Sequence, residues 1–107
     1  QIGISETLER YIIELVFATR RPLQYGLKDE ARYIQYGASP RASIAINRGA
    51  KVLAYFDDRD YVLPEDIKEI APDVLNHRVL LNYEAEADNV TTPQLIETIL
   101  RRVAIGR

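Results

Sequence analysis

Apolar residues recur at helical spacing in four segments of the chain, which predicts a mainly α-helical fold. The first segment follows Ser5, whose hydroxyl is suited to cap a helix. It ends at Arg20-Arg21-Pro22, because proline disfavours helical geometry in the residue before it. We therefore expect a first helix between these points. Its inward stripe is formed by Leu8, Ile12, Leu15, Val16 and Thr19.

A second helix is expected from about Pro40 to Phe56 and forms the centre of the predicted fold. Ile44, Val52 and Tyr55 make one face apolar, and a helix that is apolar on more than one side is normally buried. The other apolar face contains small residues that should let neighbouring helices pack closely. It consists of Ala42, Ala45, Ile46, Gly49, Ala50 and Leu53.

Prolines mark the starts of two further helices. Pro64 is followed by Glu65 and Asp66, two acids at the helix end where the backbone dipole favours negative charge. Thr92-Pro93 opens the last helix. Pro72 falls inside the third helical pattern, so we expect a kink or a split there. The expected architecture is a small four-helix domain.

Two segments between the helices have less regular patterns. The pattern of residues 22–36 is mixed, and Tyr33, Ile34 and Tyr36 fit either a short helix or extended backbone. Arg78–Tyr83 alternates in part between apolar and polar residues. It could pair with Tyr61-Val62 as a very short two-stranded ribbon.

Composition limits the classes of function. The chain has 107 residues, 47% of them hydrophobic, which fits a single globular domain over residues 1–107. A net charge of −2 gives no electrostatic case for binding nucleic acid or an anionic membrane. No cysteine is present to form a disulfide or a thiolate metal site. The chain also lacks methionine, so we expect a fragment of a longer protein. No stretch approaches the length of a transmembrane span, and we expect a cytoplasmic protein.

The strongest candidate site is the start of the second helix. Ser39 is expected to cap it and Pro40 to occupy its first position. Arg41 then places a cation at the positive end of the helix dipole, which is unfavourable in isolation. An anion held between the helix end and the guanidinium would reverse that sign. Phosphate is the expected ligand.

Other catalytic chemistry has little support. Neither a GxxxxGK[ST] loop nor a GxGxxG loop occurs, and a single histidine, His77, cannot form a multi-histidine metal site. Glu84 and Glu86 are more typical of a solvated run than of an acid–base pair. We expect no metal site, and no complete enzyme within this chain.

Two groups of side chains fit either a binding role or an ordinary structural one. The first could line a ligand cleft or be solvated charges at helix ends: Arg20, Arg21 and Arg78. The second could dock on another domain or be buried under a long loop: Tyr25, Tyr33 and Tyr36.

The segment Gly37–Ala42 resembles the sensor-2 motif in the C-terminal lid domain of MoxR-type AAA+ ATPases. The magnesium-chelatase ATPase subunit has a related lid. Leu63 departs from the family pattern, where a capping threonine is frequent, and this should weaken the cap by about 1 kcal/mol. Further similar motifs follow the family order: Ala18-Thr19-Arg20, Asp60-Tyr61-Val62, Pro64–Ile67, Ile70–Leu75, His77-Arg78 and Tyr83–Ala87.

This resemblance implies a lid that closes over ATP held by a large α/β domain of the same chain, within a ring of subunits, expected to be a hexamer. Arg41 would sense the γ-phosphate and act in catalysis only in the assembled parent, with Ser39 and Pro40 as part of the nucleotide-binding turn. ATP and Mg²⁺ would be cofactors of the parent, an ATP-hydrolysing enzyme, and the fragment alone would hold neither. Whether Arg41 acts on its own subunit's nucleotide or a neighbour's stays open. The family is understood as chaperone-like remodellers, often with partners that carry a von Willebrand A domain.

Two alternatives belong to other classes. The Val62–Ile67 segment after a long helix also resembles histone-fold-like pairing domains, which dimerise and have no nucleotide role. A helix-turn-helix nucleic-acid binder is the second alternative, and the acidic balance argues against it.

Overall fold

The computed structural model describes residues 1–105 and shows a mostly helical domain, as the sequence predicts. Its four long helices, α1, α3, α4 and α6, correspond to the four predicted ones. Three short helical segments and two short strands occupy the connections. In chain order the elements are α1 (Glu6–Arg20), the 3₁₀ helix η1 (Pro22–Tyr25), α2 (Lys28–Ala31), β1 (Ile34–Tyr36), α3 (Arg41–Phe56), α4 (Pro64–Leu75), β2 (Leu80–Leu81), α5 (Tyr83–Ala87) and α6 (Thr92–Arg102).

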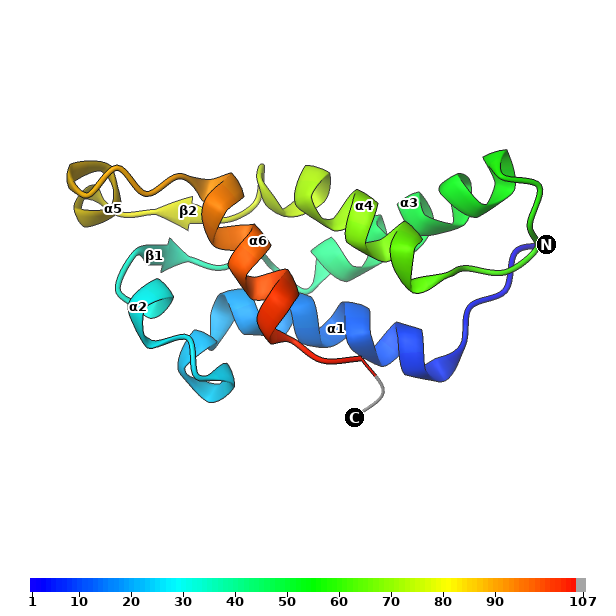
Figure 1. The fold of residues 1–107 in the computed structure, drawn as a ribbon, viewed down its shortest axis with the longest axis horizontal. Coiled ribbons are helices and arrows are strands. Elements are labelled where there is room, and N and C mark those ends of the chain that lie inside the picture. The colour runs from blue at the N-terminus through cyan, green and yellow to red at the C-terminus, as the bar shows by residue number, and fades with distance from the viewer. Residues whose placement is uncertain (106–107) are drawn as a thin grey trace.

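The domain is elongated, with extents of 45 × 25 × 20 Å. In Figure 1, α1 runs along one long side, and the antiparallel pair α3 and α4 lies along the other. Helix α6 crosses α1 near the middle of the molecule. The short elements α2, β1, β2 and α5 gather at the end of the domain away from the N-terminus.

Side chains from all four long helices meet in one hydrophobic core. Leu15, Ile46, Ile67 and Ile96 are each completely buried or nearly so. Small residues of α3 let α4 approach closely, because a Cβ atom added at Gly49 would overlap the side chain of Ile70. The predicted role of the small-residue face is therefore confirmed.

The second apolar face of α3 is exposed, so the expectation that this helix is buried on both faces is wrong. Ile44 is 54% exposed, Val52 50% and Tyr55 67%. Helices α1 and α4 pack against the opposite side of α3, which carries the completely buried Ala42, Ala50 and Ala54. Within residues 1–105, these neighbours leave the outer face in solvent.

The ribbon forms between different strands from those predicted. β1 pairs antiparallel with β2, with Ile34 opposite Leu81 and Tyr36 opposite Leu80. Tyr61 instead forms an isolated parallel bridge with Gly3. The predicted pairing fails because helix α4, about 18 Å long at 1.5 Å per residue, separates Tyr61 from β2. Of the helix and the extended backbone that the sequence allows here, the structure shows extended backbone at residues 34–36.

The helix ends follow the sequence signals with some exceptions. The Ser5 hydroxyl accepts a hydrogen bond from the Leu8 N–H at 3.2 Å, which confirms the first cap. Leu63 has no capping group, and the Asp66 carboxylate accepts its N–H at 2.8 Å instead. Pro72 does not split α4, which continues to Leu75. The Glu84–Glu86 run lies on the short helix α5 rather than in a loop.

Candidate functional site

Arg41 lies at the first position of α3 and is exposed. The first turn of α3 contains no acidic residue, whereas α1 begins with Glu6 and Glu9. Across residues 1–105, the Arg41 guanidinium has no hydrogen bond or ion pair. A cation is thus present at the positive end of the helix dipole, and residues 1–105 supply it with no ion-pair partner.

Ser39 and Pro40 form the turn that leads into the helix. By its hydrogen bonds α3 begins at Arg41, but Pro40 already has helical dihedral angles (φ −56°, ψ −21°). The Ser39 hydroxyl accepts a hydrogen bond from the Arg41 N–H at 3.3 Å. The expected start of this helix is therefore correct to within one residue.

The residue before this turn is bound by the last turn of α1. The Thr19 hydroxyl accepts a hydrogen bond from the Ala38 N–H at 2.9 Å and donates one to the Val16 carbonyl at 2.6 Å. The Arg20 guanidinium donates from Nη1 to the Ala38 carbonyl at 3.2 Å. Both backbone polar groups of Ala38 are thus satisfied by adjacent side chains of α1.

Gly37 allows this approach of the two segments. A Cβ atom at Gly37 would overlap the Thr19 carbonyl and would lie 2.8 Å from the Arg20 Cα atom. The structure thus shows close backbone packing at this glycine. Thr19 also has a role that its place in the inward stripe does not reveal. The sequence signal for this role was a hydroxyl residue placed among apolar residues near the end of a helix.

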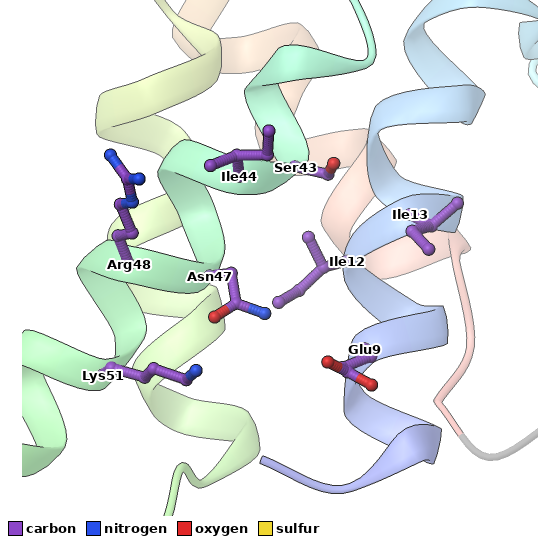
Figure 2. Close-up of a pocket in the computed structure, with 8 residues that line it drawn as sticks. All are labelled: Glu9, Ile12, Ile13, Ser43, Ile44, Asn47, Arg48 and Lys51. Carbon is purple, nitrogen blue, oxygen red and sulfur yellow. The ribbon is translucent and has the colours of Figure 1, made fainter. Parts of the chain in front are cut away.

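A groove between α1 and α3 runs next to this turn. One hollow of about 420 Å³ is lined by Phe17, Arg20 and Pro40 together with Ile13 and Ser43. The last two also line a second hollow of about 430 Å³ further along both helices. Figure 2 shows this second hollow. Its apolar residues come from α1 and α3, and its charged residues are Glu9, Arg48 and Lys51.

The remaining candidate cations lie apart from Arg41 in the chain and have ordinary surroundings. Arg21 is exposed at the end of α1. Arg78 donates to the Val74 carbonyl at 3.4 Å in the turn after α4, and His77 is exposed beside it. Only Arg20 of the three arginines thus touches the turn that precedes Arg41.

The three candidate tyrosines differ in how far they are buried. Tyr33 is buried and donates a hydrogen bond from its hydroxyl to Asp88 at 2.7 Å, which raises the pKa of Tyr33. Tyr25 is half-buried and packs edge-on against Phe17, with 6.3 Å between ring centroids. Tyr36 is 64% exposed on β1.

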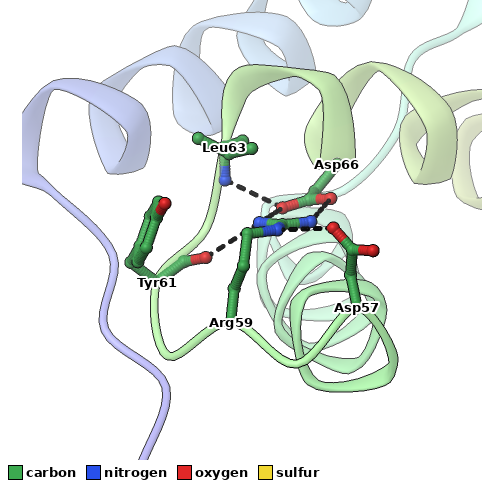
Figure 3. A network of polar contacts seen from close by, with 5 residues as sticks. All are labelled: Asp57, Arg59, Tyr61, Leu63 and Asp66. Atoms are coloured by element: carbon green, nitrogen blue, oxygen red, sulfur yellow. Dashed lines mark hydrogen bonds and ion pairs between the residues drawn. The ribbon is translucent and has the colours of Figure 1, made fainter.

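A second polar cluster joins α3 to α4 (Figure 3). Arg59 donates to both carboxylate oxygens of Asp66, at 2.8 and 2.9 Å. It also donates to Asp57 at 2.8 Å and to the Tyr61 carbonyl at 3.0 Å. Hydrogen bonds from Arg59 and from the Leu63 N–H lower the pKa of Asp66 despite its burial. The side chains of this cluster bond one another and the adjacent backbone, so we assign it a structural role.

Neither a metal centre nor a membrane-spanning helix is evident in the part of the chain that the structure describes. Residues 1–105 hold no group of three or more histidine, aspartate or glutamate side chains placed to bind a metal ion. No helix within them is long and apolar enough to cross a bilayer. The candidate chemistry is therefore concentrated at Arg41 and its turn.

Comparison with known proteins identifies the class of domain. A family model described as the AAA lid domain matches residues 27–99, and the chain belongs to this family. It is a lid of the MoxR type, as its sequence motifs indicate. The chain is 43% identical over 102 residues to the chaperone MoxR1 of Mycobacterium tuberculosis, covering 95% of this chain and 27% of that protein.

Two further comparisons support the same class of domain. A crystal structure of a protein from Cytophaga hutchinsonii assigned as an ATPase superposes with a TM-score of 0.96 at 66% identity, covering 99% of this chain and 32% of that one. The chloroplast magnesium-chelatase subunit ChlI of Chlamydomonas reinhardtii is 45% identical over 49 residues, 46% of this chain and 12% of that protein. The chain thus spans less than a third of the curated relatives' length.

Proposed function

We propose that this lid closes over ATP held by a large α/β domain of the same protein and that Arg41 senses the γ-phosphate. The observation that carries the proposal is the exposed guanidinium at the start of α3, which has no partner within residues 1–105. An anion at this helix end would interact favourably with both the dipole and the guanidinium. The terminal phosphate of a nucleotide fits this position.

The chemistry would be divided between two domains. The large domain would bring the phosphate loop and the groups that bind Mg²⁺. Arg41 would stabilise charge on the transferred phosphoryl group, as phosphate-facing arginines do in other ATPases. Ser39 and Pro40 would shape the turn and fix where Arg41 begins.

We further propose that the parent protein is a chaperone-like remodelling ATPase that works as a ring of subunits. The similarity to the chaperone MoxR1 supports the remodelling role. AAA family membership supports the ring. In such a ring, Arg41 would act on the nucleotide of its own subunit or of a neighbour. A protein with a von Willebrand A domain is the proposed partner class.

ATP hydrolysis by the full-length parent tests the role of Arg41. We expect Arg41→Ala to lower turnover by about 100-fold, the usual cost of removing one donor to transition-state charge. Arg101→Ala is the matched control, since Arg101 is an exposed arginine on α6 that pairs with Glu97 at 3.4 Å. Equal turnover of wild type and Arg41→Ala, with both folded by circular dichroism, would contradict the role.

The exposed apolar face of α3 favours a second candidate function, a helical interaction module without a nucleotide role. Ile44, Val52 and Tyr55 would then contact a partner or a second copy. This candidate predicts a stable dimer of the isolated domain and no effect of Arg41→Ala on the parent. Light scattering during size-exclusion chromatography measures the first quantity directly.

A further inference from the structure

Ala38, the residue before the turn that leads to Arg41, is hydrogen-bonded to α1 through both of its backbone polar groups. Its N–H is held by the Thr19 hydroxyl at 2.9 Å and its carbonyl by the Arg20 guanidinium at 3.2 Å. Ala38 and Thr19 are both completely buried. Water therefore cannot replace Thr19 as the acceptor without an opening of the structure.

The direction of the Thr19 hydroxyl is set by its own helix. Its proton is donated to the Val16 carbonyl at 2.6 Å, so an oxygen lone pair remains for the Ala38 N–H. The close approach at Gly37 adds a second constraint, because the backbone there lies against Thr19 and Arg20. The end of α1 thus fixes both the position and the orientation of the peptide before the turn.

Few free dihedral angles separate this anchor from Arg41. Pro40 fixes its own φ angle. The Ser39 hydroxyl accepts the Arg41 N–H at 3.3 Å, and the Ser39 carbonyl accepts the Ala42 N–H at 2.9 Å. A displacement of Ala38 would therefore move the Arg41 backbone with it.

From this geometry, and on the basis of the function proposed above for Arg41, we propose that Thr19 is a positioning residue for Arg41. It holds the Ala38 peptide so that the guanidinium enters the nucleotide site in the geometry that catalysis needs. Thr19 is 0% exposed and cannot touch a ligand itself. Its effect on ATP hydrolysis must therefore pass through the turn.

The test uses Thr19→Val in the full-length parent, because valine keeps the shape of the side chain and removes the hydroxyl. Misplacement of a catalytic group by about 1 Å costs up to about 100-fold in rate. We expect kcat to fall by about 10-fold or more, with a smaller change in KM. Thr19→Ser keeps the hydroxyl and should restore most of the loss. Thr98→Val on α6 is the matched control, because the Thr98 hydroxyl donates to the Gln94 carbonyl of its own helix at 3.1 Å.

The same substitution in an Arg41→Ala background separates positioning from general destabilisation. If Thr19 acts through Arg41, Thr19→Val causes less than about a 2-fold further loss once Arg41 is absent, since coupled residues are not additive. A full additional loss in that background would overturn the inference while leaving the role of Arg41 intact. So would unchanged kcat for Thr19→Val in the wild-type background.

Two further outcomes are distinguishable. If Arg41→Ala alone leaves turnover unchanged, the proposed function and the positioning role both fail. If Thr19→Val does not fold, Arg20→Met tests the same anchor. It removes the second hydrogen bond to Ala38 from an exposed side chain. The Arg20→Met loss should again disappear in the Arg41→Ala background, and an additive loss would contradict the anchor.

Discussion

Arg59 and Asp66 form a bidentate ion pair across the turn between α3 and α4, with N–O distances of 2.8 and 2.9 Å. The side chains are only 16% and 8% exposed. Asp66 also accepts a hydrogen bond from the Leu63 N–H. The same carboxylate therefore binds the residue before α4 and Arg59 of the preceding loop. One acidic side chain therefore stabilises the loop that connects α3 to α4.

Lowering the pH should weaken the ion pair between Arg59 and Asp66. The pKa of Asp66 is lowered in the folded protein, chiefly by its hydrogen bonds with Arg59. A lowered folded-state pKa adds stability that is complete above the unfolded value, near about 4, and is lost as the pH falls through the folded value. We expect the melting temperature of wild type to fall over this acidic window more steeply than that of Asp66→Asn. Asp57→Asn is the control, since Asp57 is 72% exposed and should matter less. Parallel curves for wild type and Asp66→Asn would contradict the expectation.

Gly37 should tolerate no larger side chain. Gly37→Ala places a methyl group against the Thr19 carbonyl and Arg20 Cα, both of which are backbone atoms that cannot rotate away. We expect a loss of about 1–3 kcal/mol in unfolding free energy, measured by urea denaturation. Gly3→Ala is the matched control, because the nearest atom to its added Cβ is the Asp60 carbonyl oxygen at 3.8 Å. A loss as large at Gly3 would show that the crowding at Gly37 is not the cause.

Reversing the charge of Arg41 should stabilise the free domain. Arg41→Glu replaces a cation by an anion at the start of α3, where the dipole favours negative charge, so we expect a gain of about 0.3–1 kcal/mol. The same reversal in the last turn of α6, Arg101→Glu, should destabilise, both through the dipole and through replacement of the ion pair with Glu97 by two like charges. Thermal unfolding at low ionic strength compares the two variants. A gain in stability with a loss of ATP hydrolysis would fit a residue retained for function.

Helix α4 can gain the cap that it lacks. Leu63 has extended dihedral angles (φ −104°, ψ 157°) that suit a capping residue but no side-chain acceptor. Leu63→Thr supplies one but also removes half-buried apolar surface, and Leu63→Ala removes that surface alone. We expect the threonine variant to be more stable than the alanine variant by about 1 kcal/mol. Equal unfolding free energies of the two variants would contradict a stabilising cap at residue 63.

The long helices could be predicted from sequence because their signals are local. Ser5, Pro64 and Thr92 mark helix starts whatever the rest of the chain does. The ribbon could not be predicted, because the pairing of Ile34 with Leu81 depends on where α4 carries the chain. Helical periodicity likewise showed that α3 is apolar on two faces but not which face its neighbours cover.

The candidate site divides in the same way. The helix start at Arg41 follows from the local order of serine, proline and arginine. Its anchor joins Thr19 to Ala38, 19 residues apart, through a side chain and a peptide group. Such a contact leaves no periodic trace in the sequence. Gly37 was visible as a glycine, but its close neighbours on α1 were not.

The hydrogen bond from Ala38 to Thr19 also has a kinetic consequence. This amide proton is hydrogen-bonded to a side chain rather than to a helix or strand partner. Ala38 is completely buried, so its exchange with deuterium requires the segment before Arg41 to move away from α1. The exchange rate at Ala38 therefore measures how often the segment before Arg41 detaches from α1.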